Sequence, residues 1–123
     1  MTATAVGRAG LTSADDAALC IVTLGAELTA YVAGATNVAE FDSWLAARDG
    51  PAWQVRRRLA AAAELVNIFV TANRSALTAA WLREMDPTGC MPARVLRFFR
   101  GDETSIKALL EAGETWALTA AAE

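Results

Sequence analysis

Apolar residues recur at helical spacing along almost the whole chain, and this pattern predicts a series of α-helices. In one segment, Val38, Phe41, Trp44 and Leu45 fall at positions i, i+3, i+6 and i+7, on one face of a helix. Capping residues, glycines and prolines set the expected boundaries. The predicted helices are 13–24, 26–33, 38–47, 51–72, a segment from a cap at Asn73 or Ser75 to residue 85, 93–100, and 103–121.

The segment 51–72 is the predicted centre of the fold. Its apolar positions cover nearly the whole circumference of the helix, which is typical of a helix buried inside a domain. The apolar positions are Val55, Leu59, Ala61, Ala62, Leu65, Val66, Ile68, Phe69, Val70 and Ala72. Because no strand pattern, linker or internal repeat interrupts the helices, we expect one compact all-α domain of six to seven helices over 13–123, after an aperiodic leader, 1–12, expected to be disordered.

The composition argues against an enzyme. The 123 residues contain no histidine, which removes the commonest general base and the commonest zinc ligand. The serines therefore have no imidazole to activate them, and no glycine-rich nucleotide loop is present. Cys20 and Cys90 lie far apart and form no metal-binding motif. We expect no catalytic site, no cofactor and no metal, with both cysteines as free thiols.

The chain is expected to be cytosolic. The longest mostly apolar stretch, 59–72, includes Glu64 and Asn67 and is shorter than the roughly 20 residues that a membrane-spanning helix needs. The first ten residues lack the apolar core of a signal peptide. These features predict no membrane association.

Residues 26–47 have the spacing of a helix-turn-helix. Ala30 stands where the two helices would cross, Gly34 in the turn, and Phe41 or Trp44 as the apolar anchor of the second helix. Phosphate contacts need cations, yet the net charge is −3 and no Arg or Lys lies between Arg8 and Arg48. We therefore favour a structural helix pair over DNA binding. The weak DNA-contact candidates are Thr36, Asn37, Ser43, Arg48, Arg56, Arg57 and Arg58.

Several short motifs resemble those of the Xre/MbcA/ParS group of antitoxins. They are LGAELTAYVAG at 24–34 followed by Trp44, then WLREMDP at 81–87, MPARVLR at 91–97 and LLEAG at 109–113. The resemblance covers about residues 24–117. It implies an all-helical protein that pairs with a RES-type, NAD-degrading toxin, occludes the toxin's active site with its C-terminal region, and often dimerises and represses its own operon.

Two departures from that pattern bear on function. Ser43, preceded by Asp42, stands where relatives carry an arginine beside the tryptophan, which argues against binding of operator DNA. Asp86 replaces the usual asparagine before Pro87 and can cap the same turn.

The surface near the last two helices is the predicted toxin-binding region. Arginines at i, i+3 and i+6 would share one face, which could meet an acidic rim or simply be solvated. The predicted partner contacts are Arg94, Arg97, Arg100, Asp102, Glu103 and Trp116. We expect an antitoxin-like binding protein that forms a homo-oligomer. The alternatives are a DNA-binding regulator, including one encoded by a phage, and an accessory homodimer whose partner covers part of 51–72.

Overall fold

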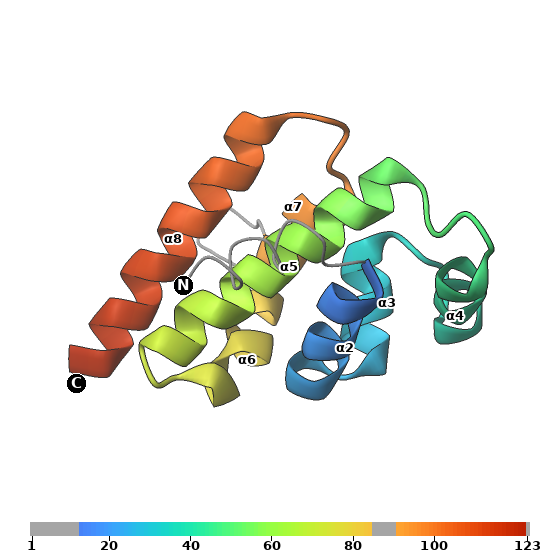
Figure 1. Ribbon diagram of the computed structural model, residues 1–123. Helices are drawn as coiled ribbons and strands as arrows, with labels where there is room; N and C mark the ends of the chain where they lie inside the picture. Colours follow the sequence, from blue (N-terminus) through green and yellow to red (C-terminus); the bar gives the residue numbers. More distant parts are fainter. Residues whose placement is uncertain (1–12, 85–90, 123) are drawn as a thin grey trace, which may run out of the picture.

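The computed structural model describes residues 13–84 and 91–122, and all of its regular structure is helical (Figure 1). Seven α-helices and a 3₁₀ turn occur in these two ranges, which contain no strand, so the predicted all-α fold class is confirmed. The elements are α2 (Ser13–Leu24), α3 (Ala26–Ala33), α4 (Val38–Ala46), α5 (Trp53–Thr71), η1 (Ser75–Leu77), α6 (Thr78–Arg83), α7 (Pro92–Arg97) and α8 (Glu103–Ala122).

The predicted helix boundaries are close to the observed ones, with two main differences. The helix expected over 93–100 ends at Arg97, because Phe98 leaves the helical conformation and caps it. The segment predicted from a cap at Asn73 or Ser75 begins with the 3₁₀ turn η1 at Ser75, and Asn73 takes a left-handed φ of 61°. The predicted leader 1–12, the turn at 86–89 and Cys90 lie outside the described residues.

Helix α5 runs through the middle of the molecule, as its apolar pattern predicted (Figure 1). It contacts α2, α3, α6, α7 and α8. Leu59, Leu65, Val66 and Phe69 are fully buried on it. Val70 was expected to be buried as well, but it lies in the last turn of α5 and is 52% exposed. The spacing of apolar residues identifies the apolar face of α5. It does not predict how much of that face the neighbouring helices bury.

The core has two adjoining parts that share α5. In the larger part, the Phe69 ring lies 5.7 Å from the Trp81 ring and 5.8 Å from the Trp116 ring, which joins α5 to α6 and α8. The smaller part holds α4 through Phe41, the single fully buried residue of that helix, while Trp44 is only partly buried. Helix α4 is therefore peripheral, and its anchor is Phe41 (Figure 1).

Gly34 ends α3 and starts the turn toward α4. Its φ of 97° is left-handed, and the N–H of the next residue, Ala35, donates to the Ala30 carbonyl at 3.0 Å, a common way to end a helix. A Cβ at this position would also lie 2.7 Å from Nη1 of Arg58. Both the backbone conformation and the close approach of Arg58 require glycine here.

Among the described residues, no helix combines enough length with enough apolarity to cross a bilayer.

The buried thiol of Cys20 predicts a loss of stability at alkaline pH. Burial, and secondarily the negative charge of Asp16, raise the pKa of Cys20 from 9.0 to about 12. The unfolded thiol ionises near 9.0, so the unfolded chain releases its proton first. The stabilisation that the buried, protonated Cys20 gives to the folded state is thus fully present below pH 9 and is lost as the pH rises toward 12. Over that range the free energy of unfolding falls by at most about 1.4 kcal/mol per pH unit. Urea unfolding across this range should measure the slope.

The matched control for this prediction is Cys20→Ala, which should reduce the loss of stability over the same pH range. The folded protein should also resist alkylation of Cys20 by iodoacetamide, because the reactive species is the thiolate. Mass spectrometry of the peptide that contains Cys20, with and without urea, reports this directly. Rapid alkylation without urea would contradict the burial of the thiol.

Candidate partner-binding surface

The polar residues of the predicted DNA-facing helix stabilise that helix itself. The Asn37 side chain accepts a hydrogen bond from the Glu40 N–H, and the Glu40 carboxylate accepts one from the Thr36 N–H, both at 2.8 Å. The Ser43 hydroxyl donates to the Glu40 carbonyl at 3.0 Å. This reciprocal cap fixes the start of α4. The outward face of α4 carries the exposed Asp42, which would repel phosphate.

The three consecutive arginines of α5 do not form one cationic face. Arg56 donates to the Pro51 carbonyl at 2.8 Å, Arg57 pairs with Glu103, and Arg58 points toward the end of α3. Arg48 is exposed in the loop after α4. Arg56, Arg57 and Arg58 therefore each have a different partner within the chain.

Arg58 and Arg97 together cap the C-terminal end of α3. Arg58 donates to the Ala33 carbonyl at 3.1 Å and to the Phe99 carbonyl at 2.8 Å. Arg97 donates through Nη1 to the carbonyls of Tyr31 and Ala35, both at 2.9 Å. The end of a helix carries partial negative charge, which these cations neutralise.

This capping position has an electrostatic cost for Arg58 and changes the predicted role of Arg97. Burial lowers the pKa of Arg58, and the charge of Arg97 lowers it further. Arg97 was expected to be exposed with Arg94 and Arg100, but it is half-buried against α3. The prediction of one shared arginine face is thus wrong, because α7 ends at Arg97 and α3 covers that side of it.

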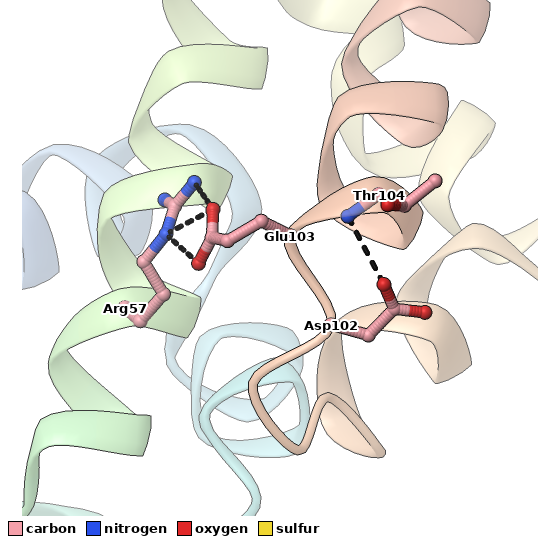
Figure 2. A network of polar contacts seen from close by, with 4 residues as sticks. All are labelled: Arg57, Asp102, Glu103 and Thr104. Atoms are coloured by element: carbon pink, nitrogen blue, oxygen red, sulfur yellow. Dashed lines mark hydrogen bonds and ion pairs between the residues drawn. The ribbon is translucent and has the colours of Figure 1, made fainter.

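Asp102 and Glu103 stabilise the start of α8 (Figure 2). The Arg57 guanidinium faces the Glu103 carboxylate, with Nη2 to Oε1 at 2.8 Å and Nε to Oε2 at 3.0 Å. Asp102 turns the other way and accepts hydrogen bonds from the Thr104 N–H at 3.1 Å and the Ser105 hydroxyl at 2.7 Å. The hydrogen bonds hold the pKa of Asp102 below its ordinary value, and Arg57 does the same for the pKa of Glu103.

Trp116 was predicted as an exposed partner contact, and the structure corrects this. Its side chain is partly buried and its ring packs against Phe69 in the core. Of the six predicted partner contacts, Arg94 and Arg100 are exposed without a carboxylate partner among the described residues. The Arg94 guanidinium lies over the Phe98 ring, 5.2 Å from its centroid.

The sequence reasoning missed two exposed aromatic residues, and both adjoin the buried Phe99. Trp53, at the start of α5, is 50% exposed, and Phe98, at the end of α7, is 54% exposed. The Trp53 ring meets the buried Phe99 ring edge to face, with centroids 6.2 Å apart. We call Trp53, Arg94, Phe98 and Arg100 the Trp53–Phe98 surface. A sequence signal existed, since neighbours such as Phe98 and Phe99 cannot both face one core.

The described residues offer little that could hold a metal. No group of three or more His, Cys, Asp or Glu side chains is gathered at one place in the described part of the chain. Two grooves are present there, one of about 340 Å³ between α3 and the start of α4, and one of about 260 Å³ between α5 and α8. The second is lined mainly by apolar and uncharged side chains with Glu114 at its edge.

No family model matches the sequence, and comparisons with curated proteins and with solved structures give no match.

Proposed function

We propose that this protein acts by binding another protein through the Trp53–Phe98 surface, and that the partner is a RES-type, NAD-degrading toxin. One observation carries the proposal: Trp53 and Phe98, each about half exposed, both adjoin the buried Phe99, since the Trp53 ring contacts it edge to face and Phe98, with Arg94 over its ring, precedes it in the chain. Trp and Arg are among the residues most enriched at the energetically dominant positions of protein interfaces.

The aromatic side chains of this surface are already held in place. Trp53 contacts the Phe99 ring, and its ring also lies against Gly101, where a Cβ would be 3.5 Å from Cη2. Arg94 stacks on Phe98. Ordering side chains on binding costs about 0.5–1.5 kcal/mol for each flexible one, so a prearranged surface loses less of its affinity.

The choice of partner rests on the resemblance of residues 24–117 to antitoxins. In that group the C-terminal region covers the active site of the toxin, and α7 and the loop that follows it belong to the matching region. Arg94 and Arg100 give this surface a positive charge that suits an acidic rim on the partner.

The geometry does not favour operator DNA as the ligand. Helix α4 presents Asp42 outward, and Arg56, Arg57 and Arg58 each have a partner within the chain. A DNA-binding surface needs several cations free to reach phosphates.

Coexpression with a RES-type toxin encoded in a neighbouring open reading frame tests the proposal, and the absence of such a frame would count against it. The protein should copurify with the toxin and prevent the loss of cellular NAD. Phe98→Ala and Arg100→Glu should each weaken binding at least about tenfold, as expected of central interface residues. Val22→Ala is the matched control, because Val22 is an 86% exposed apolar residue on α2, and it should leave binding unchanged.

Two results would contradict the proposal. If the toxin neither copurifies with this chain nor is inhibited by it, the antitoxin role fails. If the complex forms but Phe98→Ala and Arg100→Glu bind as well as the parent chain, the Trp53–Phe98 surface is not the contact. Circular dichroism of each variant checks that the helices are intact.

A further inference from the structure

The groove between α3 and the start of α4 combines an apolar wall with an arginine. Its volume is about 340 Å³, and Ala30, Ala35 and Val38 form its apolar side. Arg97 and Asn37 supply polar groups, and the exposed Glu27 also lines it. A groove of this size suits a small ligand, or a terminal side chain of a larger one, better than a helix.

The Arg97 guanidinium is fixed in the groove wall with one edge unused. Its Nη1 donates to two carbonyls, and the group lies over the Tyr31 ring, 4.7 Å from the centroid. Its Nε and Nη2 have no hydrogen-bond partner in the described part of the chain and are not buried there. This is the same edge with which Arg57 holds the Glu103 carboxylate. A fixed fork of two donors matches a carboxylate.

The positive charge at this groove is not balanced by an ion pair. Neither Arg97 nor its neighbour Arg58 has a carboxylate within ion-pair distance among the described residues, and the charge of Arg97 lowers the pKa of Arg58. The N–H groups of Val38 and Ala39, the first two of α4, have no hydrogen-bond partner in the same part of the chain. The start of that helix adds partial positive charge.

We propose that this groove binds a monocarboxylate with a short apolar body, whose two oxygens meet Nε and Nη2 of Arg97. The apolar wall receives the body of the ligand, and Glu27 disfavours anions of higher charge such as phosphate. The carboxylate belongs either to a free small acid or to the C-terminal residue of a peptide. The site is separate from the Trp53–Phe98 surface and does not depend on the proposed function.

Nuclear magnetic resonance of the full ¹⁵N-labelled chain tests the proposal. The probes are sodium 4-methylpentanoate and N-acetyl-glycyl-leucine, each compared with its neutral amide at equal ionic strength. The carboxylates should give saturable shifts at the Arg97 Nε–H and at the amides of residues 36–39, and the neutral amides should give none. Saturation by the free acid alone assigns a small-molecule ligand, and saturation by the peptide assigns a peptide terminus. Equal shifts with the neutral amides would overturn the proposal.

Variants provide a second test that does not depend on one substitution folding well. Arg97→Lys keeps the charge but loses the fork and should weaken binding about tenfold. Glu27→Gln, on the exposed rim, should tighten it about two- to threefold by removing a like charge. Arg83→Lys, at an exposed arginine in the last turn of α6, is the matched control and should leave the carboxylate affinity unchanged. Unchanged affinity in both Arg97→Lys and Glu27→Gln, or shifts spread over all exposed arginines, would overturn the proposal.

Discussion

Replacing Phe69 by alanine is expected to lower the free energy of unfolding by about 4 kcal/mol. The Phe69 side chain is fully buried on α5, and its ring lies within 6 Å of two tryptophan rings, Trp81 at 5.7 Å and Trp116 at 5.8 Å. The substitution removes buried apolar surface, leaves a cavity where three helices meet, and deletes both aromatic contacts. The free energy of unfolding of a small domain is about 5–15 kcal/mol, so this loss is a large share of the total stability.

Urea unfolding followed by tryptophan fluorescence measures this effect, since Trp81 and Trp116 report on the same part of the core. The matched control is Phe98→Ala, the same chemical change at a residue that is 54% exposed, with an expected loss below about 1 kcal/mol. Equal losses in the two variants would contradict the packing of α6 and α8 on α5.

Gly113→Val should lower the free energy of unfolding by about 3 kcal/mol, because α8 packs tightly against Leu65 of α5 at this glycine. A Cβ at Gly113 would lie 2.7 Å from Cδ2 of Leu65 and 3.3 Å from the Trp81 ring. Leu65 is fully buried and cannot move aside without displacing its own neighbours. The branched side chain therefore forces the two helices apart along their contact.

Two further variants on α8 separate this overpacking from helix propensity. Ala112→Val makes a similar change at the adjacent exposed position and should cost only about 0.5 kcal/mol. Gly113→Ala should lose less than Gly113→Val, because alanine favours the helix by about 1 kcal/mol over glycine and thereby offsets part of the clash. Thermal unfolding by circular dichroism ranks the three. Gly113→Val as stable as Ala112→Val would mean that α8 does not lie this close to α5.

Most of the fold could be predicted from the sequence because helices depend on neighbours a few residues apart. The apolar spacing of the central segment identified α5 as the buried helix, and Gly25 and Gly34 follow the last residues of α2 and α3 as predicted, whereas α7 ends before Gly101, at Arg97. The apolar spacing did not predict burial correctly where burial depends on which other helices pack over a residue. It treated Phe41 and Trp44 as equal anchors, although Phe41 alone is fully buried.

The candidate surface was harder to predict, because its residues are assigned by contacts across the chain. Arg97 reads as an exposed position on a short helix, yet its partners lie 66 and 62 residues earlier. Arg57 and Glu103 are 46 residues apart. Local spacing cannot show which carbonyl or carboxylate a guanidinium will reach. For the same reason Trp53 and Phe98 were not separated from the aromatic residues of the core.

The double hydrogen bonding of Arg58 has a consequence for how the chain assembles during synthesis. One guanidinium binds both the Ala33 carbonyl, at the end of α3, and the Phe99 carbonyl, just after α7. The cap of α3 also needs Arg97. The helices that precede α7 can form as they leave the ribosome, but this cap cannot form until the residues through Phe99 have been synthesised.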